Sequence, residues 1–204
     1  MQQAQQYLLS ILRNKDTPRN IFRATAHTLS RLLALRTVDH LHLTQKPITT
    51  PTGTTIGFSI QQRIVIIPIL RSGMIMVDPF LEIFTQAYVG VVGLHRDEVT
   101  AKPHLYYEQF PEISQEDQII IVDPMIATGG TGVAALKHLK ERNANLQTLI
   151  FANIINAPEG IAHIKENFPE ITIISAATDP GMNDKKFIVP GLGDFGDRYF
   201  GTEK

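Results

Sequence analysis

Asp123 and the loop that follows it form the stretch of this sequence best suited to chemistry. The stretch reads Asp-Pro-Met-Ile-Ala-Thr-Gly-Gly-Thr over residues 123–131. It lies between an apolar run, 118–122, and an amphipathic run, 132–142, so the order strand, loop, helix is predicted. A helix N-terminus offers backbone N–H groups without intrahelical partners and a partial positive charge, which together suit a phosphate group.

The carboxylate of Asp123 is expected at the rim where open α/β sheets bind their ligands. An ionised carboxylate accepts hydrogen bonds from two vicinal hydroxyls, so we interpret the stretch as a cradle for ribose 5-phosphate. It lacks the lysine of a nucleoside triphosphatase loop and the glycine spacing of a dinucleotide fingerprint. The alternative is an ordinary turn whose Asp and Thr residues only cap the next helix.

Arg71 is a second candidate ligand-binding residue. It follows the apolar run 63–70, which has the character of a strand buried on both faces of a parallel sheet. At the end of such a strand an arginine can bind an anion through two hydrogen bonds, and Gly73 allows close backbone approach. The alternative is a surface salt bridge.

The C-terminal segment 186–201 is apolar and rich in glycine, unlike a frayed end. Glycines let main-chain N–H and C=O groups approach a flat ligand closely. A pyrimidine edge alternates donors and acceptors, so backbone groups could read it as strands read each other. The alternative is a tail that docks for stability or for dimer contact.

The spacing of apolar residues predicts the elements that position these candidates. Parallel strands alternating with helices predict an α/β fold with a central, mostly parallel sheet flanked by helices. The stretch 95–111 is expected to be a long loop, functional or mobile. The predicted helices are 2–12, 20–35 (capped by Asn20), 74–84, 132–142 and 158–168, and the predicted strands are 54–60 (an edge or hairpin strand), 63–70, 87–94, 118–122, 147–155 and 171–175.

Composition narrows the classes of protein to which this chain can belong. Its 204 residues predict a single domain, with N-terminal helices in 1–36, a sheet core in 63–176 and the segment 186–201. Nineteen Lys and Arg against 20 Asp and Glu disfavour a nucleic-acid polymer as partner. Cysteine is absent, and neither a signal sequence nor a membrane span is evident, so we expect a soluble cytoplasmic protein. His40 and His42 lack the further ligands of a metal site.

The sequence of residues 123–131 resembles the phosphoribosyl diphosphate (PRPP) loop of type I phosphoribosyltransferases. A proline after the first acid is typical of the uracil phosphoribosyltransferase branch. Three further stretches agree with that branch in the same order, namely 68–73 (Pro-Ile-Leu-Arg-Ser-Gly), 95–98 (His-Arg-Asp-Glu) and 190–197 (Pro-Gly-Leu-Gly-Asp-Phe-Gly-Asp).

The resemblance implies an enzyme that condenses uracil with PRPP to UMP and diphosphate, with Mg²⁺ carried mainly by PRPP. It also implies a flexible loop that closes over PRPP and a C-terminal hood that binds the base, and we expect a homo-oligomer. The implied catalytic residues are Asp194 and Arg96. The implied PRPP site is Arg71, Arg96, Asp123, Pro124, Met125, Ile126, Ala127, Thr128, Gly129, Gly130, Thr131 and Asp194, and the implied uracil site is Ile188, Gly193, Asp194 and Phe195.

The sequence departs from the family in three places. It lacks the basic His-Lys-Leu-Gly segment near the N-terminus, Lys102 stands near a position that is often acidic, and Phe195 replaces a small residue. The Phe195 side chain must therefore point away from the base or reshape the pocket. A phosphoribosyltransferase for another base, a weakly catalytic sensor of PRPP or a nucleotide, and a structural module are the alternatives.

Overall fold

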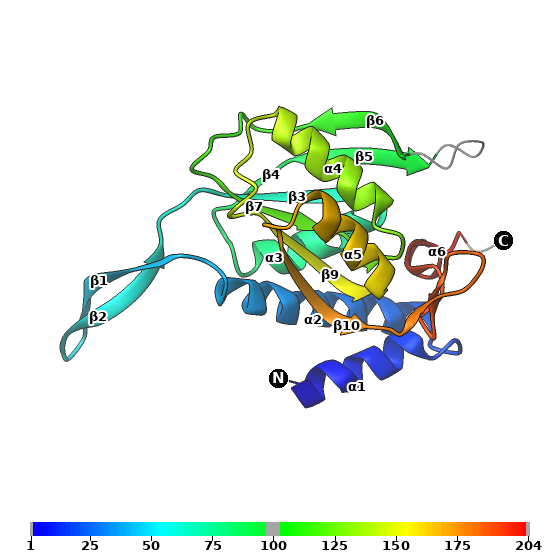
Figure 1. Cartoon of the computed structure of the whole chain (residues 1–204). Helices are drawn as coiled ribbons and strands as arrows, with labels where there is room; N and C mark the ends of the chain where they lie inside the picture. Colours follow the sequence, from blue (N-terminus) through cyan, green and yellow to red (C-terminus); the bar gives the residue numbers. More distant parts are fainter. Residues whose placement is uncertain (1, 97–102, 203–204) are drawn as a thin grey trace.

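A central sheet organises the computed structural model, which describes residues 2–96 and 103–202. In these residues eight strands form the sheet in the order β10-β9-β7-β3-β5-β6, with β4 beside β3 and β8 beside β9 (Figure 1). The strands are β3 (Ile64–Leu70), β4 (Tyr88–Val89), β5 (Val91–Arg96), β6 (Pro103–Gln109), β7 (Gln118–Val122), β8 (Met125–Ile126), β9 (Ile150–Asn156) and β10 (Thr172–Thr178).

The sheet is mostly parallel, as predicted, and only β6 runs antiparallel to its neighbour β5. Strand β3 explains why the apolar runs are continuous. Ile64 and Ile66 face one hydrophobic layer, whereas Val65, Ile67 and Ile69 face the other, so the strand has no solvent face.

Helices cover both faces of the sheet (Figure 1). One layer contains α1 (Gln2–Arg13), α2 (Arg19–Val38), the 3-10 helix η1 (Ser72–Met76) and α3 (Val77–Leu81), and the other contains α4 (Gly130–Glu141) and α5 (Pro158–Asn167). The amphipathic character predicted for 132–142 is confirmed, because Val133, Leu136 and Leu139 of α4 are all buried in the second layer.

Two predicted helix boundaries were wrong. Helix α2 begins at Arg19 with Pro18 at its N-cap position, so Asn20 lies inside the first turn and does not cap the helix. The helix expected over 74–84 is divided into η1 and α3 and ends at Leu81. Proline lacks an N–H group, and Pro79 therefore fits the first turn of a new helix but not the interior of a continuous one.

The long loop expected over 95–111 is also wrong for residues 103–109, which form β6. Tyr106 and Tyr107 favour an edge strand, and Pro103 is tolerated at its first position. Residues 97–102, another part of the predicted loop, lie outside the described residues.

A hairpin of β1 (Leu43–Thr50) and β2 (Gly53–Ile60) projects away from the sheet (Figure 1). The prediction of a hairpin strand over 54–60 is confirmed, whereas β1 was not predicted. At the other end of the chain, β11 (Gly181–Met182) pairs with β12 (Ile188–Val189), and α6 (Phe195–Phe200) follows. No helix among the described residues is long and apolar enough to span a bilayer.

Candidate active site

Asp123 lies directly after β7, at the carboxyl edge of the sheet, and its backbone N–H donates to the carbonyl of Ala152 on β9 at 3.2 Å. The residue as a whole is half-buried, and protein atoms crowd its carboxylate. Loss of hydration raises the pKa of Asp123 to about 7, and a hydrogen bond from the backbone N–H of Met125 opposes this rise. The ionised form is therefore short of hydrogen-bond donors, which the hydroxyls of a sugar would supply.

The loop after Asp123 enters α4 through Gly129, whose φ of 75° is left-handed. The first helical hydrogen bond joins the N–H of Val133 to the carbonyl of Gly129 at 2.9 Å. The N–H groups of Gly130, Thr131 and Gly132 therefore have no intrahelical acceptor, and the helix dipole adds positive potential beside them. This geometry suits an anion.

A cavity of about 110 Å³ lies between Asp123 and the loop, with Phe151 in its wall. Not every predicted loop residue can offer a side chain to it. Pro124 is buried and does not line the cavity, whereas Ile126 lines it but is 3% exposed and packs in the hydrophobic core. Pairing of β8 with β9, which the sequence did not predict, turns Ile126 inward.

Helix α5 supports this loop from behind, through two residues that sequence reasoning missed. A Cβ atom on Gly160 would meet the carbonyl oxygen of Ala127, and one on Gly129 would lie 2.4 Å from the carbonyl oxygen of Gly160. His163 Nδ1 lies 2.9 Å from the carbonyl oxygen of Thr128. The sequence predicted α5 but carried no signal that it would touch the loop.

Arg71 follows β3 at the same edge of the sheet, and the Leu70–Arg71 peptide is cis. Its guanidinium lies 3.5 Å from the carboxylate of Asp197, 3.2 Å from the hydroxyl of Thr202 and 4.8 Å from the ring centre of Phe200. The side chain is nevertheless 54% exposed. Arg71 therefore rests on the C-terminal segment and keeps N–H groups available to an anion.

The predicted base-binding residues lie in the C-terminal segment between β12 and α6. The backbone N–H of Gly193 makes no hydrogen bond among the described residues. The exposed Asp194 caps α6, because its carboxylate accepts from the N–H of Asp197 at 2.8 Å. Ile188 is 4% exposed, so its side chain belongs to the core, and only its backbone remains for recognition.

The sequence left open whether the Phe195 side chain points away from the base or reshapes the pocket, and the structure places this side chain in the hydrophobic core. Its side chain is 1% exposed, and its ring centre lies 5.2 Å from that of Phe22 on α2 and 6.3 Å from that of Tyr199. The ring points into the hydrophobic layer under α2, whereas Gly193 and Asp194 just before it are exposed.

Close contacts at two glycines join the three predicted segments at one edge. A Cβ atom on Gly73 would lie 2.4 Å from the carbonyl oxygen of Val122, next to Asp123. A Cβ atom on Gly196 would lie 2.6 Å from the hydroxyl of Ser72. The loop that carries Arg71 therefore lies between Asp123 and α6. Arg96 ends β5 at this edge, but its side chain and Lys102 fall outside the described part of the chain.

A larger hollow of about 1110 Å³ lies at the opposite edge of the sheet, where Arg63 precedes β3 and Asp117 precedes β7. Open α/β sheets bind ligands beyond the carboxyl ends of their strands, and this hollow lies at the amino ends. We therefore place the candidate active site at Asp123.

The sequence and the fold both match known proteins. The family model of uracil phosphoribosyltransferase matches residues 1–202. Uracil phosphoribosyltransferase of Finegoldia magna is 42% identical over 196 residues, covering 96% of this chain and 93% of that protein. That of Limosilactobacillus fermentum is 40% identical over 199 residues, covering 97% and 94%.

Solved structures show the same fold. The AQ2163 protein from Aquifex aeolicus is 33% identical and superposes with a TM-score of 0.86, covering 96% of this chain and 93% of that one. A hypoxanthine-guanine phosphoribosyltransferase from Bacillus anthracis superposes with a TM-score of 0.52 at 14% identity, over 79% and 80% of the two chains, which shows a shared fold only. The match over residues 1–202 and the identities near 40% show that this chain belongs to the uracil phosphoribosyltransferase family.

Proposed function

We propose that this protein transfers the 5-phosphoribosyl group of PRPP to N1 of uracil, giving UMP and diphosphate. Family membership supports the reaction, and the observation that carries it is the meeting of Asp123, the α4 N-terminus and Arg71 at one edge of the sheet. A ribose, its 5-phosphate and a diphosphate require a carboxylate, a group of N–H donors and a cation, and this edge supplies all three.

The sugar is held by the loop and the strand end before it. Asp123 accepts hydrogen bonds from the ribose hydroxyls, and the N–H groups at the start of α4 bind the 5-phosphate. The loop from Pro124 to Thr131 contributes mainly backbone, because Pro124 and Ile126 are buried. Fixing the sugar at both ends aligns its anomeric carbon with the base, which lowers the entropic part of the barrier.

The reaction breaks the bond between the anomeric carbon and diphosphate and forms a bond from that carbon to N1. The transition state resembles an oxocarbenium ion, as in glycoside cleavage. Arg71 and Arg96 stabilise the negative charge that develops on the departing diphosphate. N1 of uracil loses its proton, and we assign Asp194 as the carboxylate that accepts it.

Uracil recognition rests on the backbone around Gly193 and on Ile188, with Asp194 and Phe195 as neighbours in the segment. The unpartnered N–H of Gly193 supports this assignment. Because the Phe195 ring packs against Phe22, it does not cover the exposed backbone of Gly193.

Mg²⁺ is the cofactor that we propose for PRPP. Among residues 2–96 and 103–202, no three His, Cys, Asp or Glu side chains gather as a metal site. The donor set at this edge, the separate carboxylates of Asp123 and Asp194 beside an anion cradle, fits an ion that takes most of its ligands from diphosphate, sugar oxygens and water. When bound, Mg²⁺ would neutralise charge on the diphosphate.

A panel of bases with labelled PRPP tests the proposal. We expect diphosphate release with uracil and little with cytosine, hypoxanthine or guanine. Turnover with one of the other bases would show a phosphoribosyltransferase of different specificity. PRPP binding without release for any base would show a sensor. In the same assay, Asp123→Asn should weaken PRPP binding while the circular dichroism spectrum stays unchanged.

A further inference from the structure

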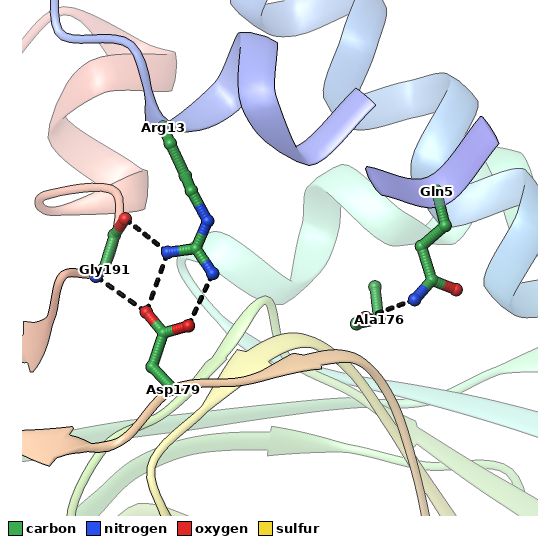
Figure 2. Close-up of polar contacts among 5 residues, drawn as sticks. All are labelled: Gln5, Arg13, Ala176, Asp179 and Gly191. Carbon is green, nitrogen blue, oxygen red and sulfur yellow. Dashed lines mark hydrogen bonds and ion pairs between the residues drawn. The ribbon is translucent and has the colours of Figure 1, made fainter. Parts of the chain in front are cut away.

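A partly buried ion pair connects the N-terminal helix to the base-binding segment (Figure 2). Arg13, the last residue of α1, hydrogen-bonds both carboxylate oxygens of Asp179, which follows β10. The same guanidinium donates to the carbonyl of Gly191 at 2.8 Å. Asp179 in turn accepts from the N–H of Gly191 at 2.7 Å. Both backbone polar groups of Gly191 are therefore held by one ion pair.

A small shift of the backbone at Gly191 would move the residues that we assign to uracil binding. It lies between Ile188 and Gly193, the two positions whose backbone we assign to uracil. Its φ of 62° is left-handed, and a Cβ atom there would lie 2.1 Å from the carbonyl oxygen of Ile188. The tight turn at Gly191 therefore sets the direction in which the backbone of Gly193 leaves.

Low solvent exposure strengthens the ion pair between Arg13 and Asp179. Asp179 is 4% exposed and Arg13 28%, so water screens the pair only weakly. Burial raises the pKa of Asp179, but the hydrogen bonds from Arg13 and Gly191 outweigh it, and the pKa lies below its ordinary value. Asp179 therefore stays charged at neutral pH. Arg198 strengthens the connection by donating to the carbonyls of Leu192 and Asn14, each at 2.7 Å.

We propose that Arg13 and Asp179 are positioning residues for uracil, which makes α1 part of the base site although it supplies no group that touches the base. The inference rests on the proposed function. Loss of Arg13 releases the Gly191 carbonyl and leaves Asp179 buried without its cation, so the Gly191 turn relaxes and the Gly193 backbone moves from the base edge.

The chain contains a matched control at the opposite edge of the sheet. Arg63 binds both carboxylate oxygens of Asp117 and the carbonyl of Glu112. Asp117 accepts a backbone N–H, that of Ser114, and is also 4% exposed. Arg63→Met therefore removes the same set of bonds as Arg13→Met at a place remote from the base segment.

The test compares Arg13→Met, Arg13→Lys and Arg63→Met in steady-state kinetics with uracil and PRPP varied separately. Because misplacing a binding group by about 1 Å can cost up to about 100-fold, we expect Arg13→Met to raise the KM for uracil about tenfold or more. The KM for PRPP and kcat should change less than about twofold, the pattern of lost uniform binding of one substrate. Arg13→Lys should be intermediate, since an ammonium group cannot repeat the planar fork.

A double variant, Arg13→Met with Asp179→Asn, separates positioning from stability. It removes the unpaired buried charge, so its Tm should recover toward that of the wild type. The KM for uracil should stay raised, because the Gly191 carbonyl still lacks its donor. Recovery of the KM for uracil together with the Tm would overturn the proposal. A rise in the KM for uracil in Arg63→Met equal to that in Arg13→Met would also overturn it.

Hydrogen exchange tests the positioning role of Arg13 and Asp179 independently of the proposed reaction. Amides of 188–194 should exchange at least about tenfold faster in Arg13→Met than in Arg63→Met, since the held turn is lost only in the former. If the wild type releases no diphosphate with uracil, the proposed function fails, while exchange still decides whether the pair holds the segment. Equal exchange in the two variants would overturn the positioning role in either case.

Discussion

A Cβ atom on Gly160 would stand 2.3 Å from the carbonyl oxygen of Ala127, so α5 touches the phosphate loop backbone to backbone. No side chain fits this contact without a shift of the loop or the helix. We expect Gly160→Ala to destabilise the fold by about 1–3 kcal/mol, the usual cost of overpacking. We expect it also to raise the KM for PRPP more than the KM for uracil, because the displaced loop carries the phosphate donors.

Gly53→Ala is the control for this prediction, because no atom lies within 4 Å of a Cβ at Gly53 in the projecting hairpin. Thermal unfolding and the two KM values are measured for both variants. Equal KM values for PRPP in Gly160→Ala and the wild type would show that the loop does not depend on α5.

Asp123 should make stability depend on pH. Folding raises its pKa from an ordinary value near 3.8 to about 7, so the folded protein holds a proton that the unfolded chain has released. This contribution to stability is complete below the unfolded pKa and is lost as the pH rises through the folded pKa. Asp123→Asn has no such proton. Its Tm should therefore match the wild type near pH 4 and exceed it by a growing margin up to pH 7.

Unfolding curves at several pH values, without ligand, measure that margin. A difference in Tm that is constant from pH 4 to pH 8 would mean that the carboxylate is as well hydrated in the folded protein as in the unfolded chain.

Arg71→Lys should weaken diphosphate binding without harming the fold. Lysine keeps the charge but loses the planar fork that binds an anion through two hydrogen bonds. We expect the KM for PRPP to rise about tenfold, the equivalent of about 1.4 kcal/mol. The Tm should fall little, because the side chain is 54% exposed. An unchanged KM for PRPP would remove Arg71 from the diphosphate site.

Phe195→Leu should affect stability and leave base choice alone. The ring is buried against Phe22 and Tyr199, so a smaller side chain leaves a cavity, with a cost of about 1–3 kcal/mol. The ratio of kcat/KM for uracil to that for 5-fluorouracil should stay within about twofold of the wild type, since we assign base recognition to the backbone of this segment and not to the ring. A larger change in that ratio would place the ring in the base pocket.

The sequence predicted the sheet well because its strands are buried on both faces. Runs such as 64–70 and 119–122 have no polar positions to blur the pattern, and the inward face of helix α4 carries Val133, Leu136 and Leu139. Strand β6 was missed because an edge strand with Pro103, His104 and Glu108 resembles a loop in composition. Its pairing with β5 depends on a neighbour, which periodicity does not report.

The candidate site was predicted in outline from residue types at strand ends. Asp123 and Arg71 follow buried strands, and parallel strands bring their ends to one edge. The supporting contacts were not predicted. Gly160, His163 and Arg13 reach the site through tertiary packing, and nothing in their local sequence indicates which backbone carbonyl each will meet.

The hydrogen bond between Arg13 and Gly191 joins positions separated by 178 residues. Contacts this distant in sequence form late, since the intervening chain must first be ordered. Leu9 and Leu12 of α1 belong to the same hydrophobic layer as Leu192 and Phe195. During synthesis from the N-terminus this layer is completed only after Leu192 and Phe195 have left the ribosome. In a nascent chain that ends before residue 190, the apolar face of α1 would therefore lack these packing partners. Exposed apolar surface of this kind is what chaperones bind.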